Sequence, residues 1–178
     1  MHLSTLPLRV LVASAAIYCI SGSSVVVAQD HVSVQQARIQ AIVDDLTARL
    51  AIADAVHVSI VPSNRLLMSV EPAELTFELK VEDGWADGLN DTELKAAVAH
   101  ELGHVWIFTH HPFLQTEQLA NEVAMRLVSP NVLAQLYEKV WKHTNVKGDL
   151  ARFLGPEVAR GLASLEAVPA SPEASHVP

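Results

Sequence analysis

Two histidines and a glutamate in one short stretch have the types and spacing of a metal site. His100 and His104 flank Glu101 in the pattern H-E-x-x-H. Residues four apart on a helix have their β-carbons about 5–6 Å apart on one face, so both imidazoles can bind one ion. Glu101 lies about 100 degrees around the helix from His100, where it can contact a metal-bound water without binding the metal. The pattern predicts a Zn²⁺ ion bound by the two histidines, with Glu101 as a general base.

A zinc site of this kind needs a third protein ligand, and Glu117 is the predicted one. Pro112 must end the helix that carries the histidines, and a second helix can then fold back across the first. A residue near the start of that second helix would meet the histidine pair. Asn121 shares the face of Glu117, and its amide oxygen could accept the free N–H of a liganding histidine. Small residues at Ala120 and Ala124 would let the two helices pack closely.

Three other side chains compete with this assignment. His110 stands six residues after His104, where the metzincin pattern places its third histidine. That pattern uses a glycine to turn the chain, and the corresponding residue here is Ile107. On a continuous helix His110 would lie about 9 Å further along the axis and would point away from the pair. His111 would lie about 10 Å beyond His104, and Glu122 would face solvent.

The segments AAVAHELGHV and TEQLANEVA together resemble the gluzincin metallopeptidases. In that family, a helix with H-E-x-x-H is followed by a helix with E-x-x-x-D or E-x-x-A-N. Two branches are similar: the HtpX-like and CAAX-prenyl-peptidase group, and the ImmA/IrrE-type peptidases. The resemblance covers residues 56–130. The chain departs from one branch because Asn121 stands where an aspartate is usual. It also departs from the membrane-bound members, since no membrane helices accompany this core. It implies that zinc is bound by His100, His104 and Glu117, that Glu101 is the catalytic base, and that Asn121 orients a ligand.

The expected activity is zinc-dependent hydrolysis of peptide bonds in a peptide or protein substrate. Bound zinc lowers the pKa of its water to about 7, and Glu101 accepts the proton of that water. The strand expected at 74–82 could bind an extended substrate backbone. A donor for the developing oxyanion has no motif match, and the candidates are Tyr137, His143 and Arg126.

The alternative is a non-catalytic zinc-binding or interaction protein built on a vestigial peptidase fold. Such a protein would use the same three ligands and fill the fourth position with a side chain such as His110, which closes the site to water. The presence of Glu101 argues against this alternative, because metal binding alone does not require a carboxylate beside the ion.

Hydrophobic periodicity and turn signals predict the elements that position these residues. The expected fold class is α+β, a zincin-like minimal core with an N-terminal helix, a small three-stranded sheet, the H-E-x-x-H helix, the glutamate helix and C-terminal helices. Asn90 and Glu93 form a capping-box pattern at the start of the H-E-x-x-H helix. The other expected elements are a helix at 32–53, strands at 56–61, 65–70 and 74–82, and helices at 114–128, 131–143 and 150–163, the last with a break at Gly155 and Pro156.

Residues 1–28 are predicted to be a signal peptide. An apolar stretch at 10–20 is followed by small residues up to Ala28, a context for cleavage before Gln29. An uncleaved membrane anchor is the rival interpretation, although the serine-rich segment 21–24 leaves the apolar run short of the about 20 residues that a spanning helix needs. The protein is therefore expected to be exported, periplasmic or extracellular, without stable membrane insertion.

The predicted mature chain comprises one domain at 29–166 and a disordered Pro-, Ser- and Ala-rich tail at 167–178. The sequence carries a net charge of −8, and removal of the leader with Arg9 makes the chain more negative. This charge argues against nucleic acid as a partner. The single cysteine, Cys19, lies in the leader, so the mature domain is expected to lack disulfides.

Overall fold

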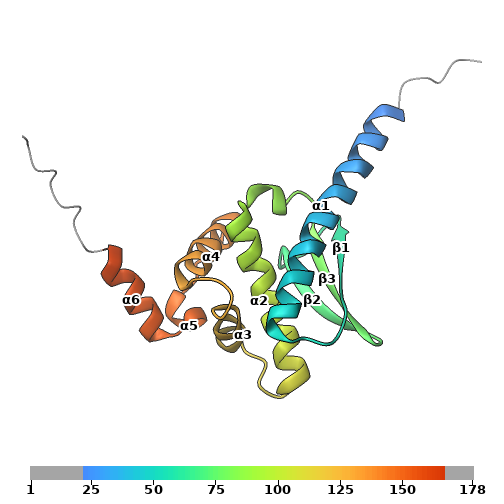
Figure 1. Cartoon of the computed structure of the whole chain (residues 1–178). Coiled ribbons are helices and arrows are strands. Elements are labelled where there is room, and N and C mark those ends of the chain that lie inside the picture. The colour runs from blue at the N-terminus through green and yellow to red at the C-terminus, as the bar shows by residue number, and fades with distance from the viewer. Residues whose placement is uncertain (1–21, 167–178) are drawn as a thin grey trace, which may run out of the picture.

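The computed structural model describes residues 22–166 as a mixed α+β fold with six α-helices, one 3₁₀ helix and a three-stranded sheet (Figure 1). The elements are α1 (Gly22–Leu50), β1 (Val56–Val61), β2 (Met68–Ala73), β3 (Thr76–Glu82), η1 (Ala86–Gly88), α2 (Asp91–His110), α3 (Glu117–Ala124), α4 (Pro130–Thr144), α5 (Leu150–Leu154) and α6 (Pro156–Glu166). The α+β class is therefore confirmed. None of the described helices has the length and apolarity needed to cross a membrane.

Two predicted segments lie wholly or mainly outside the described residues. The predicted tail at 167–178 lies wholly outside them, and the predicted leader lies outside them at residues 1–21. The last part of that leader, 22–28, forms the beginning of α1, so the first helix starts earlier than the predicted position at residue 32. The break between α5 and α6 is where Gly155 and Pro156 predicted it.

The sheet has the strand order β1-β3-β2, with β3 parallel to β1 and antiparallel to β2. Phe77, Leu79 and Val81 of β3 are buried and alternate with more exposed residues, as expected for a strand with one core face. Because β3 is the central strand, both of its edges are paired. The prediction that the 74–82 segment binds a substrate backbone is therefore wrong, and β2 is the edge strand that contacts α2.

The second strand differs from its predicted position. It begins at Met68 instead of residue 65 and continues to Ala73. It therefore includes Glu71 and Pro72, which lie between the strands expected at 65–70 and 74–82 and carry a proline turn signal. Proline is tolerated there because β2 is an edge strand. The position of the N–H that Pro72 lacks faces away from β3, where no strand of the sheet pairs. The turn instead lies at Glu74 and Leu75, where Glu74 has a positive φ of 40°.

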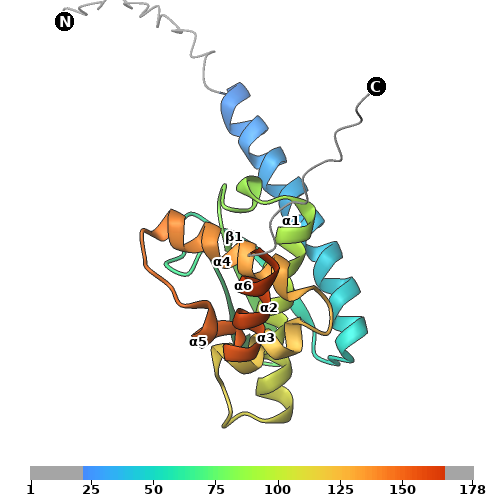
Figure 2. The same ribbon diagram turned by 90° about the vertical axis from the view of Figure 1, so that its left-hand side faces the viewer.

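Helix α2 is the central element of the fold. It contacts α1 and β2 on one side and α3 and α4 on the other (Figures 1 and 2). Its start is fixed by the predicted capping box, in which Asn90 accepts from the backbone N–H of Glu93 and Glu93 accepts from that of Asn90. Glu93 also accepts a 2.6 Å hydrogen bond from Lys139 of α4. These contacts fix the register of the helix that carries His100 and His104.

Candidate metal centre

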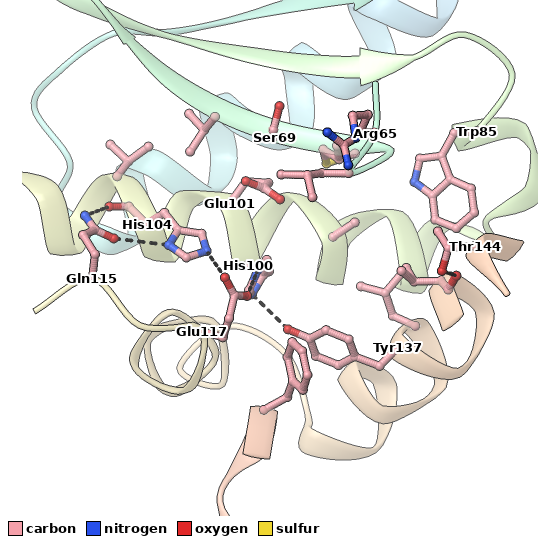
Figure 3. A pocket seen from close by; sticks show the side chains of 18 of the residues that line it. Arg65, Ser69, Trp85, His100, Glu101, His104, Gln115, Glu117, Tyr137 and Thr144 are labelled. Atoms are coloured by element: carbon pink, nitrogen blue, oxygen red, sulfur yellow. Dashed lines mark hydrogen bonds and ion pairs between the residues drawn. The ribbon is translucent and has the colours of Figure 1, made fainter. Parts of the chain in front are cut away.

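The fold brings the three predicted ligands together. His100 and His104 lie on α2, and Glu117 reaches them from the start of α3 (Figure 3). The possible ligand atoms of these residues all lie within 4.8 Å of one another. Nε2 of His100 is 3.3 Å from one carboxylate oxygen of Glu117, and Nε2 of His104 is 3.7 Å from the other. Both imidazoles therefore present the same nitrogen to the point where an ion would bind.

Glu117 lies at the start of α3, which begins later in the sequence than predicted. Helix α3 begins at Glu117 instead of residue 114, and Thr116 caps it by accepting from the backbone N–H of Leu119. Glu117 is thus the first residue of the helix and not a residue one turn inside it. A carboxylate is favoured there by the helix dipole, and the fold-back after Pro112 directs it at the histidine pair.

Asn121 fixes the orientation and tautomer of His100. Its Nδ2 donates to the carbonyl oxygen of Phe153 at 3.0 Å and to the Tyr137 hydroxyl at 2.7 Å. A carbonyl can only accept, so the amide nitrogen must face Phe153 and the amide oxygen must face His100. That oxygen lies 2.9 Å from His100 Nδ1. Nδ1 therefore carries the hydrogen, and the lone pair of Nε2 is left for a metal.

Gln115 performs the same task for His104, and sequence reasoning missed it. Its Nε2 donates to the carbonyl oxygen of His104 at 3.2 Å, which turns its Oε1 toward His104 Nδ1 at 3.3 Å. His104 is thereby also oriented with Nε2 toward Glu117. Gln115 lies in the connection before α3, where no spacing rule relates it to a residue on α2.

The charges of the group favour a cation between the two histidines. A hydrogen bond with His100 lowers the pKa of Glu117, which keeps this carboxylate ionised. Burial opposes a charge on His100, but the hydrogen bond to Glu117 and the charges of Glu101 and Glu117 raise its pKa overall. Burial and then the positive charge of His100 lower the pKa of His104. One positive charge is therefore stabilised at this position, and two imidazoles with one carboxylate are a donor set suited to zinc.

Glu101 lies beside the ligand group but does not belong to it. Glu101 is only 9% exposed, and the backbone N–H of Val70 in β2 donates a hydrogen bond to its carboxylate. Burial raises the pKa of Glu101 from 4.5 to about 7. A carboxylate with such a pKa can exchange a proton near neutral pH, as a general base must.

These residues line one cavity of about 760 Å³. Helix α2 forms its floor, β2 forms one wall, and α3 and α4 form the other (Figure 3). Most of the side chains that line it are apolar. The polar exceptions lie mainly at the metal-ligand group: His100, Glu101, His104, Gln115 and Glu117.

The competing ligands lie elsewhere. The ring of His110 stacks on Trp106 at 4.3 Å, and its Nδ1 lies 2.9 Å from the Trp106 carbonyl oxygen. His111 also contacts the Trp106 ring. Glu122 is exposed and accepts from Gln118. In the described part of the chain, none of the three is close enough to complete the ligand group, and His110 does not close its fourth position.

Gly103 allows the close approach of α2 and α3 that positions Glu117. A β-carbon at Gly103 would overlap the carbonyl oxygen of Ala120 and lie 2.9 Å from its carbonyl carbon. Ala120 and Ala124 are fully buried in the same interface, as their small size predicted. The distance between the two helices thus depends on the absence of a side chain at Gly103.

Gly103→Ala is therefore expected to push α3 away from α2 and to move Glu117 from the histidines. Such overpacking typically lowers the free energy of unfolding by about 1–3 kcal/mol. Displacement of Glu117 should in addition lower the zinc affinity by about 10-fold or more. Competitive zinc titration and thermal unfolding would measure both effects. Gly161→Ala is the matched control, since a β-carbon there meets no atom within 4 Å. Equal zinc affinities of the two variants would contradict this account of the helix contact.

Comparisons of the chain with protein-family models, curated proteins and solved structures gave no match. The resemblance of two segments to gluzincin peptidases accordingly remains a hypothesis. Function has to be inferred from the ligand group, the buried glutamate and the cavity that contains them.

Proposed function

We propose that this protein is an exported zinc-dependent peptidase of the gluzincin type, which hydrolyses peptide bonds with Glu101 as the general base. One observation carries the proposal: His100, His104 and Glu117 converge in a cavity that also contains a buried glutamate with a pKa near 7. Three protein ligands and an open position are the arrangement of catalytic zinc sites. The amide partners on both Nδ1 atoms further support zinc binding through Nε2.

A bound zinc ion would supply Lewis-acid chemistry and a nucleophilic water near neutral pH. Glu101 accepts the proton of the attacking water and delivers it to the departing amine. The backbone N–H of Val70 holds its carboxylate in place. Asn121 and Gln115 keep the two imidazoles oriented during the reaction.

The edge of β2 can bind the backbone of an extended substrate. Glu82 donates to the carbonyl oxygen of Leu67 at 2.8 Å, which identifies Leu67 as a residue hydrogen-bonded to β3. In an antiparallel pair such residues alternate with residues whose backbone groups point away from the partner strand. Met68 and Val70 therefore direct their backbone groups outward, and no other strand in residues 22–166 pairs with this edge. The N–H of Val70 already donates to Glu101, which leaves the N–H and C=O of Met68 and the C=O of Val70 for a peptide. A peptide added here would lie along the cavity.

Tyr137 is the most suitable of the three candidate oxyanion donors. Its side chain lines the cavity, while the ring of His143 lies against Trp85, and Arg126 lies over Trp106 outside the cavity lining. Burial raises the pKa of Tyr137, so the phenol stays protonated. The phenolic oxygen accepts from Asn121 and lies 3.4 Å from His100 Nδ1. Because that Nδ1 carries a hydrogen, it cannot accept from the phenol, and the phenolic hydrogen is left for a substrate oxygen.

The proposal predicts peptide cleavage that depends on zinc. The purified protein should cleave members of a broad peptide library, lose this activity when a chelator removes the metal, and regain it when zinc is added back. Mass spectrometry of the products and the zinc content of each sample measure both quantities. Cleavage that persists in the metal-free protein contradicts the proposal. A protein that holds one zinc and cleaves no peptide would support the non-catalytic alternative.

A further inference from the structure

We propose that the cavity selects substrates by a bulky apolar side chain, which binds between Trp85, Leu136 and Trp141 at one end of the cavity. This inference rests on the proposed peptidase function and names the class of peptide that the site takes. The observations that support it are the shape of the cavity, the chemistry of this end, the rigidity of its walls and the open strand beside it.

The cavity continues well beyond the metal-ligand group. Ala97 lies one helical turn before Glu101 on α2, and its small side chain leaves space above the helix. Leu136 and Val140 of α4 form the opposite wall of this space. Figure 3 shows Trp85 at this end, while Gln115 lies at the other end and the ligand group lies between them.

Arg65 is the one charged lining residue toward this end of the cavity; it is exposed, and Figure 3 shows it between Glu101 and Trp85. Thr144 supplies a hydroxyl, which already donates to the carbonyl oxygen of Val140. The remaining lining residues here are aromatic or aliphatic: Trp85, Ala97, Leu136, Val140, Trp141 and Val146. A lysine side chain would lose its hydration without gaining a partner, which is unfavourable. A large apolar side chain gains by leaving water.

The aromatic walls are held in place before any substrate binds. Trp141 packs against Tyr137 and Phe153, with ring centroids 5.5 and 5.7 Å apart. The backbone of Gly148 lies so close to the indole that a β-carbon there would overlap it. Trp85 is only 8% exposed. Since these rings have little freedom left to lose, binding against them costs little conformational entropy.

The open edge of β2 indicates that the occupant is a polypeptide chain. Met68, Ser69 and Val70 of this strand line the same cavity. The outward N–H and C=O of Met68 and the outward C=O of Val70 are suited to a peptide backbone, while the N–H of Val70 donates to Glu101. Alternate side chains of an extended chain point to the same face. A peptide paired with β2 can therefore direct one side chain into the apolar end while its backbone passes Glu101.

The selectivity can be tested by mapping cleavage sites in a peptide library with the zinc-loaded protein. We expect phenylalanine, tryptophan, leucine and methionine to be enriched at one fixed position relative to the scissile bond, by about 10-fold or more over glycine and lysine. Val140→Phe fills the space and should lower the ratio of phenylalanine to alanine at this position by about 10-fold. Leu136→Ala widens the space and should shift the preference toward the largest side chains.

Val34→Phe is the matched control for these variants. Val34 is 69% exposed on α1 and does not line the cavity, so this substitution should leave the preference of the parent unchanged. Cleavage without any preference for apolar side chains, or the same preference in Val140→Phe as in the parent, would overturn the inference and leave the peptidase proposal intact.

A binding experiment separates the inference from catalysis. Zinc-loaded Glu101→Gln should bind acetyl-Gly-Phe-Gly-amide about 10-fold or more tightly than the alanine or lysine analogue, as measured by calorimetry. The additional substitution Val140→Phe should remove this difference. Such selective binding by a protein that cleaves no peptide would support the inference and contradict the peptidase proposal. Equal binding of the three peptides would contradict the inference.

Discussion

Replacement of Glu101 by glutamine is expected to lower the rate of peptide cleavage by about 10² to 10⁴-fold and to leave the zinc content unchanged. Glutamine keeps the size of the side chain and can still accept the backbone hydrogen bond from Val70. It cannot take a proton from water. The ligand atoms of His100, His104 and Glu117 do not include Glu101, so zinc binding should persist.

Glu122→Gln is the matched control for the loss of a carboxylate. Glu122 is exposed on α3, away from the cavity lining, and accepts a hydrogen bond from Gln118. Its substitution should change neither the cleavage rate nor the zinc content. If Glu101→Gln cleaves as fast as the Glu122→Gln control, Glu101 is not the base.

The stability of the metal-free Glu101→Gln variant should also have a distinct pH dependence. Burial raises the pKa of the folded-state carboxyl from 4.5 to about 7. Between these values the unfolded chain ionises while the folded protein does not, so the parent loses stability as the pH rises from 4.5 to about 7. The variant lacks this titration. Its free energy of unfolding relative to the parent should therefore increase over this range, as measured by denaturant unfolding at several pH values. A difference that stays constant with pH would contradict the raised pKa.

Local signals predicted the helix of the candidate site correctly. The capping box of Asn90 and Glu93 fixes the start of α2, and Pro112 limits its end, so the sequence alone places the histidine pair on one helix face. The close contact of α2 and α3 also followed from the small residues Ala120 and Ala124. The capping box and the proline act on neighbours within a few residues, which a sequence displays directly, and Ala120 and Ala124 are visible in it as small residues four positions apart on one helix face.

Contacts that depend on the tertiary fold could not be predicted in the same way. Gln115 binds His104 only because the chain folds back after α2, and its position in a loop carries no periodicity. The acceptor that orients Asn121 is the backbone carbonyl of Phe153, which any residue would supply. Pro72 suggested a turn, but the edge position of β2 makes it compatible with a strand.

The second large effect concerns the ligands themselves. His100→Ala, His104→Ala and Glu117→Ala each remove one of three protein donors. Loss of a residue that only hydrogen-bonds a metal ligand typically lowers metal affinity by about 10–100-fold. Loss of a direct ligand should lower the affinity further. His110→Ala is the matched histidine control, because this ring stacks on Trp106 away from the group.

The most direct test of the central claim is the amount of zinc per folded chain, measured by native mass spectrometry after dialysis. The parent and His110→Ala should each retain one zinc, while the three ligand variants should retain almost none and keep the circular dichroism of a folded protein. Retention of zinc by Glu117→Ala together with its loss from His110→Ala would contradict the proposed ligand set and would favour a three-histidine site.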